Sequence, residues 1–179
     1  MTDKYTIVKD IFDNQISHIT LSDNSKSVGN GYVCKTPSKT MQDGFGFCAD
    51  QVELADWLLK QKEIYAEKYL LFAVPENNEN MVKIEFSHSF IGIPNDTNWI
   101  LFETAFRARN RGGVKKFDNT NMGLQYVLKL YDLSLKVAQI NNMKYNVYKY
   151  DFSATNMTFT DFAKKVMTNA QRIQLTNSR

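Results

Sequence analysis

The stretch from Thr97 to Lys116 constrains the fold more than any other part of this chain, because an apolar half is followed by a cationic half. In the apolar half, large side chains recur at helical spacing, and a threonine that can cap a helix precedes them. Two glycines, at positions 112 and 113, are typical of the residues that end a helix. The pattern therefore predicts a helix that ends in a cationic loop and packs one apolar face into the core: Trp99, Phe102, Ala105 and Phe106.

The cationic half carries five basic side chains and no acidic one, namely Arg107, Arg109, Arg111, Lys115 and Lys116. One interpretation is a solvated surface, because cations favour water and the C-terminal ends of helices. The other is a site that attracts phosphates, with aromatic side chains nearby to stack on bases. Under the second interpretation these five residues contact single-stranded RNA or DNA, and the affinity falls steeply with salt.

Composition limits the class of protein. With 179 residues, 43% of them hydrophobic, the chain is long and apolar enough for one folded domain. The net charge of +3 makes any basic patch local, which argues against a histone-like binder. No apolar run reaches membrane-spanning length and no signal-peptide pattern is present, so we expect a cytoplasmic protein with reduced cysteines and no membrane partner. Frequent Asn and Lys are typical of an AT-rich genome such as that of a phage, which would place the protein in the host cell cytoplasm.

The first half of the chain reads as strands followed by a helix. Asp50 and Glu53 have the spacing of a capping box, so a helix should begin there and reach about Tyr65. Before this helix, polar turns separate four short expected strands: Tyr5–Phe12, Gln15–Leu21, Gly31–Lys35 and Gly44–Cys48. After it, two further strands lead toward Thr97: Tyr69–Val74 and Met81–Phe90.

The C-terminal third reads as helix, strand and helix. The first helix begins at Asn119 or Thr120, reaches about Ile140 and is apolar on two sides, so it is buried on both sides or lies at a subunit interface. A strand at 144–151 and a helix from Thr158 to about Leu175 follow. We therefore expect an α+β homo-oligomer. Its antiparallel core should span residues 1–113, and a helical extension at 114–179 should pack on the same domain.

Two segments resemble each other, Gly46–Gln51 and Gly92–Thr97, and each joins a strand end to an expected helix through a polar step with an aspartate. This strand-helix pseudo-repeat resembles the Whirly and Pur-alpha class of single-stranded nucleic-acid-binding domains, most closely at Ile93-Pro94 and the following WILFETAF. The resemblance covers roughly residues 4–110. It implies two packed antiparallel sheets with both helices crossing beneath them, and single-stranded DNA or RNA as the ligand. The plant proteins' lysine-glycine-lysine signature is missing, so no contact residue carries over.

The sequence GFGF at positions 44–47 resembles the core of the aromatic strand motif of RNA-recognition and cold-shock domains. Phe45 and Phe47 would share one face of a strand, where the glycines leave the rings accessible to bases. The alternative is that both rings fill the core, as buried aromatic side chains commonly do. Tyr148, on the predicted strand near the C-terminus, is a further candidate for stacking on a base.

Two catalytic or metal-binding patterns match only in part. His18 and Thr20 resemble one unit of two-histidine phosphodiesterases, but the second unit would need His88, and Ser89 beside it is one position out of place. Cys34, Cys48 and the two histidines match no usual spacing of zinc ligands. No phosphate-binding or dinucleotide-binding glycine pattern is present.

The sequence therefore favours a single-stranded RNA- or DNA-binding protein without catalytic activity, cofactor or metal. The main alternative is a structural or host-interaction viral protein that acts through a protein interface, because the helix after Asn119 is apolar on two sides.

Overall fold

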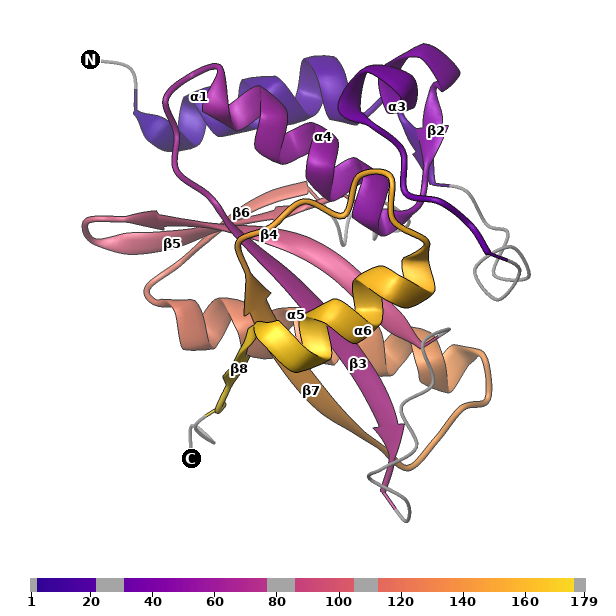
Figure 1. Cartoon of the computed structure of the whole chain (residues 1–179). Coiled ribbons are helices and arrows are strands. Elements are labelled where there is room, and N and C mark those ends of the chain that lie inside the picture. Colours follow the sequence, from indigo (N-terminus) through magenta and orange to yellow (C-terminus); the bar gives the residue numbers. More distant parts are fainter. Residues whose placement is uncertain (1–2, 22–30, 77–85, 105–112, 176–179) are drawn as a thin grey trace.

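The protein is built around one six-stranded sheet, and a computed structural model describes residues 3–21, 31–76, 86–104 and 113–175 (Figure 1). All neighbouring strands of this sheet run antiparallel, in the order β6-β5-β4-β3-β7-β8. Helices cover both faces of the sheet. The α+β class expected from the sequence is confirmed.

The central strands are buried along almost their whole length, because helices cover them on both sides. A separate pair of short parallel strands, β1 (Thr20–Leu21) and β2 (Phe45–Gly46), lies near helix α3 (Pro37–Asp43). The strands of the main sheet are β3 (Glu67–Pro75), β4 (Ser87–Asn95), β5 (Asn98–Glu103), β6 (Gly113–Phe117), β7 (Met143–Tyr150) and β8 (Gln171–Ile173).

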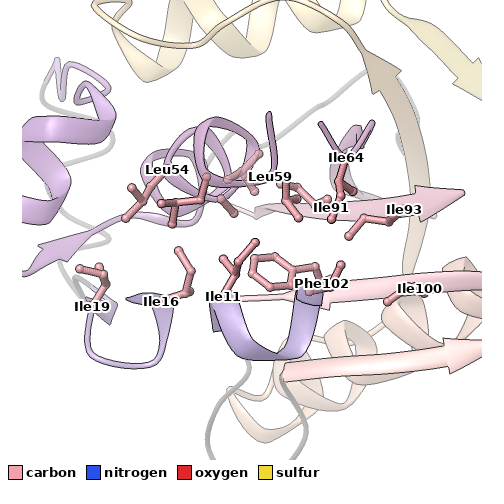
Figure 2. Packing of buried hydrophobic residues seen from close by; sticks show 14 residues of the cluster. Ile11, Ile16, Ile19, Leu54, Leu59, Ile64, Ile91, Ile93, Ile100 and Phe102 are labelled. Atoms are coloured by element: carbon pink, nitrogen blue, oxygen red, sulfur yellow. The ribbon is translucent and has the colours of Figure 1, made fainter. Parts of the chain in front are cut away.

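One face of the sheet is covered by three helices and a π-helical turn. These are α1 (Lys4–Ile11), η1 (Phe12–Ile16), α4 (Cys48–Lys60) and, farther along the face, α6 (Phe159–Asn169). Figure 2 shows aliphatic side chains of α1 and α4 packed against β4 and β5. Each such buried side chain contributes about 1.5–3 kcal/mol, so this contact fixes α4 firmly on the sheet.

The opposite face is covered by α5 (Thr120–Val137), which packs on a largely aromatic cluster. Trp99 of β5 fills the space between sheet and helix, because Gly92 and Gly123 have no side chain there. A Cβ atom at either glycine would lie within 2.0–2.1 Å of the Trp99 ring. Close approach of the ring, and not backbone flexibility, therefore requires glycine at these two positions.

The four strands predicted between residues 4 and 48 are wrong in most of their length. The segment predicted as the first strand contains α1 instead, and its buried side chains, Val8 and Ile11, are three residues apart, which is helical spacing. Shortly after the predicted strand Gly31–Lys35, Pro37 occupies the first turn of α3, where its missing N–H has no cost. Only the pairs Thr20–Leu21 and Phe45–Gly46 are extended as strands in this region of the described chain.

The predicted helix at Thr97 is also wrong, because this segment forms β5. Asn95 pairs with Asn98, so β4 and β5 form a hairpin through a tight turn, and Gly113 begins β6 instead of ending a helix. An apolar run buried on both sides has no clear period, which is why its sequence does not separate helix from strand. The strand-helix pseudo-repeat is not confirmed, because Gly92–Thr97 leads from one strand into the next.

The other predicted elements agree better with the structure. The strands at 69–74 and 144–151 and the helix after Asn119 are confirmed, and the Asn119 side chain accepts a hydrogen bond from Met122 N at 3.0 Å. The last helix ends at Asn169, and the chain then adds β8 to the sheet. Within residues 114–175, most of β6 and all of β7 and β8 belong to the main sheet, and α5 and α6 cover its two faces. Leu133 and Val137 of α5 are exposed.

Candidate active site

The site begins with Cys48, the first residue of α4. Its side chain is partly exposed, whereas the thiol of Cys34 is buried. The first turn of a helix has N–H groups without an intrahelical partner, and its positive end attracts negative charge. A cysteine that is accessible at a helix N-terminus is in the type of environment in which reactive thiols are found.

His88 lies near the start of β4 and connects the thiol to a carboxylate. Its Nε2 atom is 2.8 Å from Oε2 of Glu103, the last residue of β5, and both side chains are buried. His88 also shares a hydrogen bond with the Cys48 side chain. The hairpin of β4 and β5 therefore supplies two adjacent members of a Cys48–His88–Glu103 chain.

The charge state of His88 follows from these contacts. Burial by itself would lower the pKa of the imidazole, because it disfavours the charged form. The negative charge of Glu103 and the hydrogen bonds with Glu103 and Cys48 outweigh burial and raise the pKa of His88 to about 10. His88 therefore holds a proton at neutral pH.

Two aromatic rings fix the orientation of the imidazole. Phe90 of β4 and Tyr131 of α5 lie almost parallel to the His88 ring, at interplanar angles of 17° and 16° and centroid distances of 6.0 and 5.9 Å. Tyr131 is itself buried, and burial raises the pKa of its hydroxyl above the usual range. The helix on the far face of the sheet thus helps to hold the imidazole between thiol and carboxylate.

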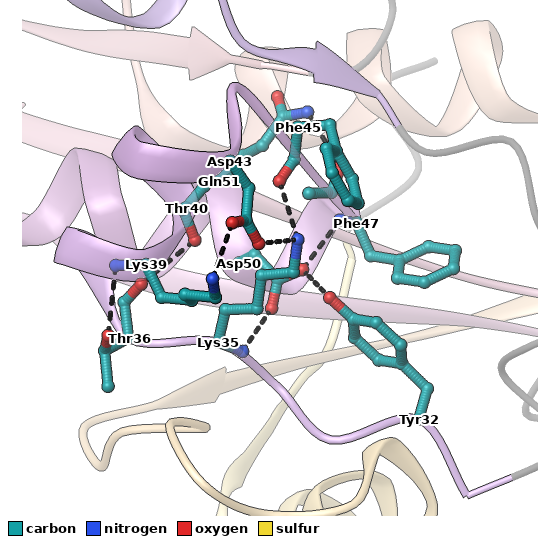
Figure 3. A network of polar contacts seen from close by, with 11 residues as sticks. Tyr32, Lys35, Thr36, Lys39, Thr40, Asp43, Phe45, Phe47, Asp50 and Gln51 are labelled. Carbon is teal, nitrogen blue, oxygen red and sulfur yellow. Dashed lines mark hydrogen bonds and ion pairs between the residues drawn. The ribbon is translucent and has the colours of Figure 1, made fainter.

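The start of α4 is held by a network of polar contacts around Asp50 (Figure 3). The Asp50 carboxylate accepts hydrogen bonds from Phe47 N, Lys35 N and the Tyr32 hydroxyl. Burial raises the pKa of Asp50, and these hydrogen bonds oppose that effect. Asp50 was predicted to cap the helix itself, but the helix begins two residues earlier and the carboxylate binds the backbone of Phe47, the residue before it.

The predicted nucleic-acid contacts are only partly visible. Arg107, Arg109 and Arg111 lie outside the described residues. Lys115 and Lys116 lie on β6, and Lys116 pairs with Asp3 at 3.1 Å and lies over the Tyr5 ring. The Lys115 ammonium is 5.7 Å from the centroid of the Tyr126 ring. Both lysines therefore have partners within the chain, as expected for the solvated-surface interpretation, and the nucleic-acid hypothesis stays a prediction.

The three aromatic candidates lie in different environments. Phe47 is buried and packs edge-to-face on Tyr32, so its predicted availability for base stacking is wrong and the core alternative holds for this ring. Phe45 is exposed, but the Lys35 ammonium lies 3.5 Å from its ring centroid. Tyr148, on β7, is half-buried and packs edge-to-face on Phe72. The fold does not combine these rings into one stacking surface.

The phosphodiesterase pattern does not form in this fold. His18 is exposed in the turn that precedes β1, whereas His88 is buried in β4 of the other sheet. The two histidines therefore do not lie on neighbouring strands, as that mechanism requires. Within the described part of the chain, no group of three or more His, Cys, Asp or Glu side chains could hold a metal ion. In the same part, no helix has the length and apolarity needed to span a bilayer.

Of the three site residues, Glu103 had no predicted functional role, and Cys48 and His88 were predicted in other roles. Glu103 lies in the segment that was predicted as a helix and that forms β5 instead. Cys48 was placed at a strand end directly before a helix, and that position was a usable signal, since helix N-termini activate thiols. A histidine elsewhere in the chain completes a known type of pairing, although only the fold shows that the two side chains meet.

No protein-family model matches the chain, and a search of curated proteins finds no match either. The class of the site therefore follows from its geometry. An accessible thiol, an imidazole and a carboxylate in series are the arrangement used for nucleophilic catalysis on several unrelated folds.

Proposed function

We propose that this protein is a cysteine-dependent hydrolase that cleaves an amide or ester through an acyl-enzyme. The observation that carries the proposal is the connected series Cys48–His88–Glu103, in which Cys48 is a partly exposed residue and the Glu103 carboxylate is buried. In this series Cys48 is the nucleophile, His88 transfers protons and Glu103 orients the imidazole and stabilises its charged form.

Acylation follows from the two hydrogen bonds of His88. In the reactive state Cys48 is a thiolate beside protonated His88. Its sulfur forms a bond to the carbonyl carbon of the substrate, and the carbonyl oxygen takes the electron pair. When this intermediate collapses, the bond from carbon to the leaving nitrogen or oxygen breaks and His88 donates its proton to the leaving group. The products are a thioester on Cys48 and a free amine or alcohol.

Deacylation reverses the roles. His88 takes a proton from a water molecule as the water oxygen bonds to the thioester carbon. The carbon–sulfur bond then breaks, a carboxylic acid leaves, and the Cys48 thiolate is restored beside protonated His88. The N–H groups of Cys48 and Ala49, in the first turn of α4, have no carbonyl within the helix to bind, so we assign to them the role of donors to the developing oxyanion.

The experiment uses p-nitrophenyl acetate as a probe with the full chain. We expect a burst of p-nitrophenolate and an acetyl group that peptide mass spectrometry places on Cys48. Cys48→Ala should abolish both, whereas Cys34→Ala, which removes the buried thiol, should retain them. His88→Gln should slow acylation by roughly a hundredfold or more. If acetylation of the wild-type protein does not depend on Cys48, or if His88→Gln leaves its rate unchanged, the proposal is wrong.

A further inference from the structure

Asp50 connects two chain segments immediately beside the proposed nucleophile (Figure 3). One carboxylate oxygen, Oδ1, is 2.7 Å from Lys35 N, and the other, Oδ2, is 2.7 Å from Phe47 N. The Tyr32 hydroxyl also donates to Oδ2. The carboxylate is completely buried, and its three donors come from the segment at residues 32–35 and from the residue directly before Cys48.

The backbone before Cys48 is restrained from a second direction. Gln51, which is also buried, donates from its side-chain amide to the carbonyl oxygen of Gly46 at 3.1 Å. A Cβ atom at Gly46 would lie only 2.8 Å from Cβ of Asp50, so the chain passes too close to Asp50 for any side chain at that position. Asp50 and Gln51 together thus fix residues 46 and 47, and through them the first turn of α4.

A stabilising role alone does not explain the placement of this charge. A buried carboxylate two residues from a nucleophilic sulfur disfavours negative charge on that sulfur, because like charges repel. For a helix N-terminus, an uncharged Ser or Thr cap would serve, as Thr158 does for α6. The carboxylate differs from such a cap because it has two oxygens, and these bind two backbone N–H groups and a phenol at the same time.

We infer that Asp50 is the positioning residue of the nucleophile: it ties the start of α4 to the segment at Tyr32–Lys35 and so holds the Cys48 sulfur in reach of His88. This inference rests on the proposed function. It assigns to Asp50 a role in reactivity that is separate from its contribution to stability. Misplacement of a reacting group by about 1 Å can cost as much as a hundredfold in rate, so a loosened helix start should be measurable.

The test measures the second-order rate of alkylation of Cys48 by iodoacetamide over a pH series, with the adduct located by peptide mass spectrometry. Asp50→Asn replaces one acceptor oxygen by a donor, so one of the hydrogen bonds must be lost. We expect the rate for the folded protein to fall about tenfold across the whole pH range. Tyr32→Phe removes only one of the three donors and should give a smaller decrease.

Asp161→Asn is the matched control, because Asp161 also lies three residues after a helix N-cap, in α6, far along the chain from the site. It should leave the alkylation rate unchanged. Urea unfolding of each variant shows whether the protein is folded under the conditions of the rate measurement. Should Asp50→Asn prevent folding, Tyr32→Phe and the wild-type protein still allow the comparison.

The outcomes separate the two claims. A wild-type Cys48 that is alkylated no faster than a free thiol, with no effect of His88→Gln, would overturn the proposed function. A fast, His88-dependent reaction that Asp50→Asn and Tyr32→Phe leave unchanged would overturn only the positioning role. A faster reaction in Asp50→Asn would also overturn it, because the carboxylate would then act on Cys48 through its charge.

Discussion

Two buried ion pairs lie beside helix α4, one next to its first residue and one near its middle, and only the first lies next to a nucleophilic side chain. Next to the first residue of α4, Glu103 pairs with His88, and the imidazole also shares a hydrogen bond with the Cys48 side chain. Farther along, Glu53 pairs with Lys68 at 3.1 Å, and Ser153 and Ala154 N donate to the same carboxylate. Every oxygen of Glu53 is thus occupied by a donor that anchors neighbouring elements.

The difference between the two ion pairs shows how one helix is both fixed to the sheet and placed next to a reactive group. Lys68 donates to Glu53 and to the carbonyl of Phe152, so its charge cross-links α4, β3 and the segment after β7. His88 instead joins a buried acid to a partly exposed sulfur, so a proton can move along the series. The Glu53–Lys68 pair holds the helix on the sheet, whereas the His88–Glu103 pair lies beside the proposed nucleophile. The following variants test that division.

The largest effect is expected at the His88–Glu103 pair. Replacing Glu103 by Gln keeps the shape but removes the charge that stabilises protonated His88. We expect hydrolysis of p-nitrophenyl acetate to fall by about 10²-fold or more, because proton transfer by the imidazole contributes at least that much. Steady-state kinetics measure the change. The same variant should retain a cooperative unfolding transition, and an unaltered rate would contradict the role of Glu103.

The next largest effect is expected at the Glu53–Lys68 pair and concerns the free energy of unfolding. Lys68→Met leaves Glu53 buried without its cation, so the free energy of unfolding should fall by about 3–5 kcal/mol. Urea denaturation at pH 7 measures this change. In the fraction that stays folded, the alkylation rate of Cys48 should remain within a factor of about two, since sites that do not touch act almost independently. A large loss of Cys48 reactivity would show that the Glu53–Lys68 pair and the site at Cys48 are coupled.

A smaller effect is expected from pH. The pKa of His88 is raised from 6.5 to about 10, so its pairing contributes stability fully below about pH 6.5 and loses that contribution as the pH rises through about 10. A hydrogen bond to a charged group is worth about 1.5–3 kcal/mol. The stability difference between the wild-type protein and Glu103→Gln should therefore be largest near pH 6 and shrink by roughly that amount at pH 10. Urea unfolding at several pH values measures it, and a constant difference would contradict the raised pKa.

The smallest effect is expected away from α4, on strand β6. Lys116 pairs with Asp3 at the surface, where such pairs contribute at most about 1 kcal/mol, so Lys116→Ala should hardly change stability. Lys115→Glu with Lys116→Glu also tests the nucleic-acid hypothesis. Fluorescence anisotropy with a labelled single-stranded oligonucleotide at low salt should show weaker binding if these lysines contact phosphates. Equal binding by the variant, or none by the wild-type protein, would remove them from any such site.

Much of the fold was predictable wherever one local signal dominated. The helix after Asn119 has a clear cap and period, and the strand at 144–151 is bounded by polar residues, so both predictions were correct. The N-terminal helices and β5 were missed. In the N-terminal helices, closely spaced apolar residues were interpreted as the alternating pattern of a strand. In β5, burial on both faces left the apolar residues without a clear period.

The sequence by itself determined that the chain is an α+β protein, that one cysteine lies close to the start of an amphipathic helix, and that a buried histidine lies in a later strand. Only the tertiary structure decided that these side chains meet. Cys48, His88 and Glu103 lie on three elements, and the register between β4 and β5 sets which acid faces the imidazole. Strand register depends on packing across the whole sheet, and a shift by one residue would turn Glu103 to the other face. The catalytic series is therefore a property of the folded chain and not of any local motif.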